Sequence, residues 1–222
     1  MSSGIPALDQ ILGTDGYPDG SVVLVVSPPG IAKEVLGYWF THAGLVQNDF
    51  CLHITKLSVK DVLRDAMVFG IDYSERVPLW MASYGGQLKL DVNDLAGLSF
   101  SIKDAVAKNA ERRLRIVIDA LSPILLLNQP EAVYRFLSQL FLELKQRDAV
   151  LLATLEDGMH PQQVVAAMEQ LFDGVVELKL FEEGMQAKPL LRVLKMRGSQ
   201  PQPGYFNFAF TSQGMEVSAF AK

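Results

Sequence analysis

Apolar positions in the first two thirds of the chain follow two alternating patterns, one typical of strands and one of helices. Continuous apolar runs rich in β-branched residues indicate strands buried on both faces of a parallel sheet. Such runs predict strands at 21–26, 50–55, 77–82, 115–119 and 149–154. Helices are expected between them at 33–45, 58–70, 100–109 and 130–147, and a polar surface loop at 85–98.

Two of these helices carry clear local signals. In 130–147, apolar residues recur at the helical period with charged residues opposite them. Ser58, followed three residues later by Asp61, is typical of a helix start, and Gly70 of a helix end. The buried face of this second helix is expected to hold Val59, Val62, Leu63, Ala66 and Met67.

After Asp173 the pattern changes to strands without helices between them. Strands are predicted at 174–181, 190–196, 205–210 and 215–218. This order indicates an α/β fold with a mainly parallel central sheet flanked by helices, joined to antiparallel C-terminal strands. The chain shows no repeat, low-complexity tract or linker, so one domain over residues 1–222 is expected.

Composition narrows the class of protein. The chain has 222 residues, 49% of them apolar, which is enough for one hydrophobic core. No apolar run is long enough to span a bilayer, and the first residues lack a signal-peptide pattern, so a cytoplasmic location is expected. The net charge of −5 argues against a broad nucleic-acid interface, which requires a basic face.

Several single residues are expected to be structural. Cys51 is the one cysteine and lies in an apolar run, which excludes an internal disulfide and predicts a small buried side chain. Trp39 and Trp80 are expected in the core. The histidines His42, His53 and His160 show no metal-ligand spacing.

The segment between the first strand and the first helix carries the candidate chemistry. A strand, a loop and a helix are the context of a Walker A motif, G-x-x-x-x-G-K-[ST], whose amides cradle phosphates. The loop here consists of Ser27, Pro28, Pro29, Gly30, Ile31, Ala32, Lys33 and Glu34. Aligned on Lys33, only the lysine of the four defining positions is kept.

Each replacement has a physical consequence. Ala32 adds a Cβ where phosphate approaches, whereas Ser27 is tolerated if its φ is negative. Glu34 replaces the magnesium-binding hydroxyl and brings negative charge towards a polyanion; two unit charges about 4 Å apart interact by about 4 kcal/mol at an effective dielectric of about 20. Alternatively, Glu34 ligates Mg²⁺ or supplies a counter-charge to Lys33. The other interpretation is a plain strand-to-helix turn with an exposed Lys-Glu pair.

Four segments in order along the chain resemble KaiC-like domains of the RecA superfamily. They are 3–13 with 20–25, 62–72, 115–122, and 195–199 with 206–208 and 214–217. The first resembles the family's "GIPGLDELLGGG" opening, the third its "VVIDSLS" Walker B strand and the fourth its terminal "KMRGS" hairpin. The resemblance covers nearly the whole chain and implies a RecA-like P-loop core.

The resemblance also implies roles for individual residues. Lys33 corresponds to the lysine that binds the β and γ phosphates, and Asp119 to the Walker B acid that supports Mg²⁺. Lys195 and Arg197 correspond to the pair that reaches phosphates of a neighbouring subunit; the alternative is a solvated strand face. ATP or ADP with Mg²⁺ is the implied cofactor. The family's catalytic glutamate pair after the second strand is replaced by Lys56 and Leu57.

Three functions are compatible with these residues. The first is a regulatory or scaffolding pseudo-ATPase with weak or absent nucleotide binding and a degenerate Walker A motif. The second is an active ATPase that uses Glu34 as a magnesium ligand. The third is a recombinase-like accessory protein that binds DNA. Expected partners are further copies in a ring or dimer, an active relative, or another protein, whereas Glu156 and Asp157 are expected in a solvent loop.

Overall fold

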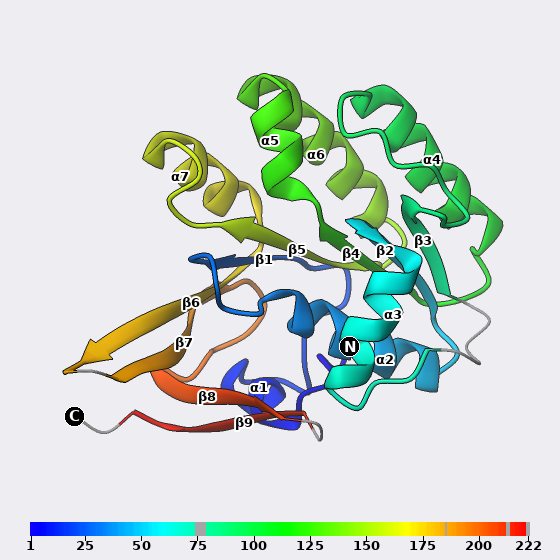
Figure 1. The fold of residues 1–222 in the computed structure, drawn as a ribbon. Coiled ribbons are helices and arrows are strands. Elements are labelled where there is room, and N and C mark those ends of the chain that lie inside the picture. Colours follow the sequence, from blue (N-terminus) through cyan, green and yellow to red (C-terminus); the bar gives the residue numbers. More distant parts are fainter. Residues whose placement is uncertain (74–78, 185, 212–213, 221–222) are drawn as a thin grey trace.

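The computed structural model describes residues 1–73, 79–184, 186–211 and 214–220 (Figure 1). Within these ranges, nine strands form one sheet in the order β3-β2-β4-β5-β1-β6-β7-β8-β9. The strands are β1 (Val22–Ser27), β2 (Phe50–Ser58), β3 (Leu79–Tyr84), β4 (Leu114–Asp119), β5 (Val150–Glu156), β6 (Gly174–Glu183), β7 (Gln186–Met196), β8 (Phe206–Thr211) and β9 (Gly214–Ala219). Neighbours from β3 to β6 are parallel, and β6 to β9 are antiparallel.

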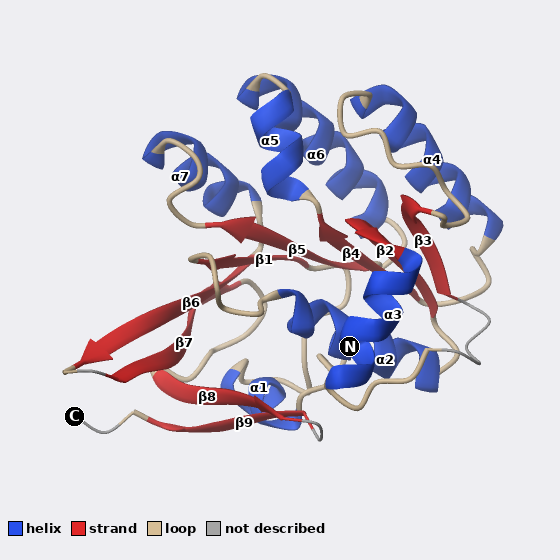
Figure 2. Ribbon diagram, in the orientation of Figure 1, coloured by secondary structure: helices blue, strands red, loops and turns tan. Residues whose placement is uncertain are grey.

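Helices cover both faces of the parallel part (Figure 2). They are α1 (Pro6–Ile11), α2 (Glu34–Val46), α3 (Val59–Val68), α4 (Leu95–Lys108), α5 (Leu121–Leu127), α6 (Pro130–Lys145) and α7 (Gln162–Leu171). Helices α4 to α7 pack on one face, and α1, α2 and α3 lie on the other, next to the β8–β9 hairpin (Figure 1). The predicted α/β class, with antiparallel strands at the C-terminal end, is confirmed.

The predicted strands and long helices agree with the structure to within a few residues, with three differences. Residues 77 and 78 of the third predicted strand lie outside the described residues, and β3 begins at Leu79. The predicted loop at 85–98 is wrong in its last part, because Asp94 caps α4 by accepting a hydrogen bond from the Gly97 amide at 2.8 Å. Helices α1, α5 and α7 were not predicted.

Helix α3 starts as its sequence indicates. The Ser58 side chain accepts a hydrogen bond from the Asp61 amide, as an N-cap does. Val62 and Ala66 are buried, but Met67 is 53% exposed, so its placement on the buried face was wrong. Strand β2 ends at Ser58, three residues beyond the predicted end of this strand.

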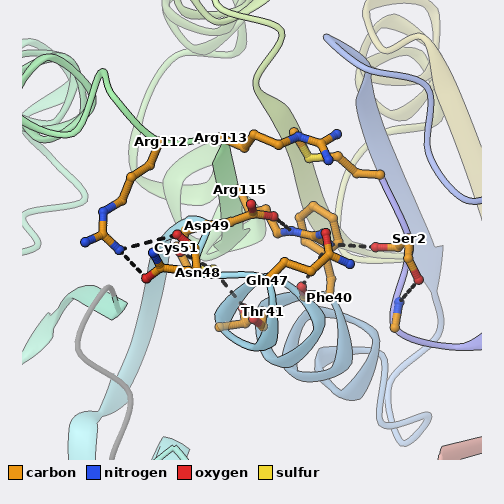
Figure 3. Close-up of polar contacts among 12 residues, drawn as sticks. Ser2, Phe40, Thr41, Gln47, Asn48, Asp49, Cys51, Arg112, Arg113 and Arg115 are labelled. Atoms are coloured by element: carbon orange, nitrogen blue, oxygen red, sulfur yellow. Dashed lines mark hydrogen bonds and ion pairs between the residues drawn. The ribbon is translucent and has the colours of Figure 1, made fainter.

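A fully buried arginine joins several elements at the amino edge of the sheet (Figure 3). Nε of Arg115, on β4, binds Oδ2 of Asp49 at 2.8 Å. Its Nη1 donates to the Ser2 carbonyl at 2.6 Å and to the Phe40 carbonyl at 3.2 Å, and its Nη2 donates to Oε1 of Gln47 at 3.5 Å. Its guanidinium carbon lies 4.8 Å from the Phe40 ring centre. Arg115 therefore links β4 to the start of β2, to α2 and to the N-terminal segment.

The residues expected to be structural lie largely inside. Cys51 is buried, as predicted, and Trp39 and Trp80 are partly buried against the core clusters. His53 is fully buried. Of the helices in the described ranges, none combines the length and the apolar character that crossing a bilayer requires.

Candidate functional site

The carboxyl ends of four parallel strands meet at one edge of the sheet. Thr55 of β2 pairs with Asp119 of β4, and Ser27 of β1 pairs with Glu156 of β5. Because β4 and β5 are also neighbours, the ends of all four strands follow one another. A cavity of about 340 Å³ lies there. It is lined by Lys33, Glu34, Lys56, Asp119, Ser122, Pro123, Leu126, Thr154, Glu156 and Met159. This edge is where open α/β sheets bind ligands.

The loop after β1 keeps part of a phosphate-binding geometry. Gly30 has φ of +88°, and a Cβ added to it would meet open space. However, the Lys33 amide donates to the Ile31 carbonyl at 2.6 Å, so this amide is used within the loop. Ser27 is fully buried and its hydroxyl donates to the Pro28 carbonyl at 3.0 Å.

The remaining loop residues lead into α2. Pro29 is exposed, Ile31 is buried and Ala32 is half-buried. Glu34 is the first residue of α2, and the residue before it, Lys33, has helical φ and ψ. The helix therefore begins at the position where a Walker A motif carries its hydroxyl residue.

The Lys33 ammonium group forms an ion pair with Glu156, the last residue of β5. The two side chains are only 12% and 19% exposed. The Glu156 amide is itself held by the Ser122 hydroxyl at 2.8 Å. Glu156 was expected in a solvent loop, but it lies in the site because β5 runs two residues further than predicted. Among the described residues, Glu156 rather than Glu34 forms the ion pair with Lys33. Asp157 is exposed, as expected.

Asp119 lies at the centre of the edge. Thr154 donates a hydrogen bond to one of its carboxylate oxygens at 2.5 Å, and Thr55 donates to the other at 3.5 Å. The pKa of Asp119 is raised to about 6, mainly by burial and also by the charges of Glu34 and Glu156. The Thr154 hydrogen bond and Lys33 act in the opposite direction. Three carboxylates and two lysines thus share one cavity, and negative charge is in excess.

The predicted metal ligands, Glu34 and Asp119, line the same cavity. In the described part of the chain, no group of three or more His, Cys, Asp and Glu side chains is arranged to hold a metal ion. A magnesium ion at this edge would therefore take most of its ligands from phosphate oxygens and water. The prediction that these two residues ligate Mg²⁺ stays a prediction.

Lys195 and Arg197 lie away from the loop. Lys195, on β7, donates to the Phe172 carbonyl at 2.6 Å, and Arg197, one residue beyond the strand, pairs with Asp173 at 3.1 Å. Gly174, which follows Asp173, lies beside Val23. Ser27 is four residues further along β1, or about 13 Å at the usual rise of a strand. Their predicted contact with phosphates would therefore require a second subunit.

Some residues at the site had not been identified as candidates. They are Thr55, Ser122 and Thr154. Thr55 and Thr154 are the polar residues with which two buried apolar runs end. Because the carboxyl ends of parallel strands meet at one edge, this ending was a usable signal. Lys56 had been considered only as a replaced glutamate, and it lines the same cavity.

The strand order, the loop between β1 and α2, and the acid at the end of β4 define a RecA-like P-loop ATPase fold. A model of the family described as "ATPase: KaiC" matches residues 1–221, and the chain belongs to this family.

Curated relatives are similar over nearly the whole chain. The circadian clock protein KaiC2 of Synechocystis is 26% identical over 222 residues, which is 98% of this chain and 39% of the relative. The circadian clock oscillator protein KaiC of Prochlorococcus marinus (strain MIT 9313) is 28% identical over 231 residues, or 98% of this chain and 45% of the relative. The chain thus spans less than half the length of these relatives.

Proposed function

We propose that this chain is a regulatory or scaffolding member of the KaiC family, a pseudo-ATPase that binds ATP or ADP weakly or not at all. The observation that carries the proposal is the ion pair between Lys33 and Glu156. Lys33 is the one Walker A residue that the loop retains, and its charge is already neutralised inside the site.

Binding of a nucleotide would have to break this pair. Phosphate oxygens would replace Glu156 beside Lys33, and the Glu156 carboxylate would then face a polyanion together with Glu34. Two like charges about 4 Å apart repel by about 4 kcal/mol at an effective dielectric of about 20. Ala32 and the internal hydrogen bond of the Lys33 amide remove further phosphate contacts. These effects all weaken nucleotide binding.

Hydrolysis faces a separate obstacle. A phosphoryl-transferring enzyme needs a group that orients and polarises the attacking water. The end of β2, where the family places its glutamates, carries Lys56 and Leu57. A lysine and a leucine supply no such group, so we expect turnover to be slow or absent even where nucleotide binds.

The second candidate is an active ATPase. It is favoured by one observation, namely that Glu34 and Asp119 line the same cavity and are carboxylates of the kind that ligate Mg²⁺. A DNA-binding role is less well supported, because the net charge is −5.

Assembly and location are part of the first proposal. We expect a single domain over 1–222 that acts in the cytoplasm through a protein partner, through further copies of itself in a ring or dimer, or through an active relative. Membership of the KaiC family, in which the relatives named above are circadian clock proteins, supports the regulatory part of this proposal.

The test is a titration with ATP, ADP and Mg²⁺ followed by calorimetry, comparing the wild type with the double variant Ala32→Gly, Glu34→Thr. The wild type is expected to bind in the millimolar range or not measurably, and the double variant at least about tenfold more tightly. Adding Lys33→Ala to the double variant should abolish the gain. Micromolar binding by the wild type would overturn the proposal.

A further inference from the structure

A second cavity lies beside the first, at the carboxyl ends of β2 and β3. Its volume is about 590 Å³, within the range of small-molecule sites. It is lined by Thr55, Lys56, Ser83, Gly85, Gly86, Gln87, Lys89, Leu90 and Val92. Most of its wall comes from the segment that connects β3 to α4, which does not line the first cavity.

The charge in this cavity is opposite to that of the first. Lys56 and Lys89 both line it, and no aspartate or glutamate does so among the described residues. In the same part of the chain, neither lysine takes part in an ion pair. Two unpaired ammonium groups in a cavity without a carboxylate favour an anion, in a protein whose net charge is −5.

A buried hydroxyl group in the wall also lacks a partner. Ser83 is 4% exposed, and its Oγ has no hydrogen-bond partner in the part of the chain that the structure describes. Buried polar atoms nearly always have one, so an unpaired hydroxyl in a cavity wall indicates a ligand or a water that accepts its hydrogen bond.

The backbone around Ser83 is held in a tight turn. The Ser83 amide donates to the Leu88 carbonyl at 3.2 Å, and the Leu88 amide donates to the Met81 carbonyl at 3.1 Å. A Cβ on Gly86 would lie 2.2 Å from the Met81 carbonyl oxygen and 3.0 Å from Oγ of Ser83. Glycine at 86 therefore allows the turn and keeps space next to the hydroxyl.

We propose that this cavity binds a small organic anion. Its phosphate or carboxylate group lies between Lys56 and Lys89 and accepts a hydrogen bond from Ser83. Its apolar or planar body packs against Leu90 and Val92, which form the apolar part of the wall. This site is independent of the loop that contains Lys33.

The two cavities share one wall residue. Lys56 lines both cavities, and Thr55, whose hydroxyl bonds to Asp119, lines the second.

The test uses AMP, inorganic phosphate and benzoate as probes, each titrated into the protein and followed by amide chemical shifts in NMR spectra. At least one probe is expected to bind and to shift the amides of the segment around 83–92. AMP binding more tightly than benzoate identifies a phosphate ligand, and the reverse identifies a carboxylate. Absence of saturable binding by all three at millimolar concentration would overturn the proposal.

Single variants test whether the anion binds in this cavity rather than at the loop that contains Lys33 or through the overall charge of the protein. Lys89→Gln should weaken binding about tenfold and Ser83→Ala about threefold, the sizes expected for one charged and one neutral hydrogen bond. Lys60→Gln, at an exposed lysine on α3 outside the cavity, and Lys33→Ala should change nothing. Equal weakening by Lys60→Gln, or weakening by Lys33→Ala alone, would contradict the proposed site. Because Lys33 lines only the first cavity, anion binding that is unchanged in Lys33→Ala tests the second cavity separately from the proposed pseudo-ATPase function.

Discussion

Two cation–carboxylate pairs lie at opposite edges of the same sheet. At the amino edge, Arg115 and Asp49 have side chains that are 0% and 4% exposed, and two backbone carbonyls and the Gln47 side chain accept the remaining guanidinium hydrogen bonds. At the carboxyl edge, Lys33 and Glu156 are 12% and 19% exposed, and two further carboxylates share their cavity.

The difference between the pairs lies in charge balance and solvent contact. The Arg115 pair is balanced and enclosed, so it holds the fold together and has little scope to change partner. The Lys33–Glu156 pair is partly exposed to solvent and shares its cavity with two more carboxylates, so Lys33 can change its partner. We therefore expect disruption of the first pair to reduce stability, and disruption of the second to change binding.

The largest effect is expected for Arg115→Met. Removing one member of a buried ion pair leaves an uncompensated charge and costs about 3–5 kcal/mol. Asp49 would be that charge, and the Ser2 and Phe40 carbonyls would lose their donor. Urea unfolding should show the loss, and the double variant Arg115→Met, Asp49→Leu should recover part of it. A loss below about 1 kcal/mol would mean that the pair does not hold the fold.

The second effect concerns pH and Asp119. Its pKa is about 6 in the folded protein, above that of an unfolded chain, so folding favours the protonated acid. The resulting stability is fully present below about pH 4 and is lost as the pH rises through about 6. Asp119→Asn should therefore be more stable than the wild type at about pH 8, by up to about 3 kcal/mol, and similar to it at about pH 4.

The check is urea unfolding of both proteins at the two pH values. Asp157→Asn, at a nearby exposed acid, serves as the matched control and should show no such pH-dependent difference. If Asp119→Asn has the same effect at both pH values, the pKa of Asp119 is not raised.

The third effect is expected for Glu156→Gln. The substitution removes the carboxylate that neutralises Lys33, so ATP should bind about tenfold more tightly, or by about 1.4 kcal/mol. The free energy of unfolding should change by less than about 1 kcal/mol, because the pair is partly exposed. Calorimetry measures the first quantity and urea unfolding the second. Unchanged affinity together with a large loss of stability would show that this pair resembles the Arg115 pair.

The smallest effect is expected for Arg197→Gln. Its side chain is 66% exposed and its partner Asp173 also binds Lys145 at 2.7 Å. Exposed ion pairs contribute about 0–1 kcal/mol, so urea unfolding should show a change of less than about 0.5 kcal/mol. A larger loss of stability would show that the Arg197–Asp173 pair stabilises the fold, as the Arg115–Asp49 pair is expected to do.

The sequence allowed the fold to be predicted where the signal is local. Buried strands are continuous apolar runs, and the N-cap at Ser58 depends on residues three positions apart. Helix α5 was missed because its sequence, Leu-Ser-Pro-Ile-Leu-Leu-Leu, is too short and too uniformly apolar to show a helical period. Helices α1 and α7 start at or just after a proline, which was an available signal.

The site was predictable only in part. The loop 27–34 was found from its position after a buried strand, and Asp119 from the resemblance of its strand to a Walker B motif. The pairing of Lys33 with Glu156 joins residues more than a hundred positions apart, and no local pattern encodes it. The same holds for Arg115, whose place in an apolar strand gives no sign of its partner Asp49.

The proposal that this KaiC-family chain binds nucleotide weakly and hydrolyses it slowly or not at all depends on the ion pair of Lys33 with Glu156 and on Lys56 and Leu57 at the end of β2. Phosphate release from ATP with Mg²⁺ tests it most directly, measured for the wild type and for Lys33→Ala. We predict that the two proteins release phosphate at the same background rate. Turnover by the wild type that is lost in both Lys33→Ala and Asp119→Asn would contradict the claim.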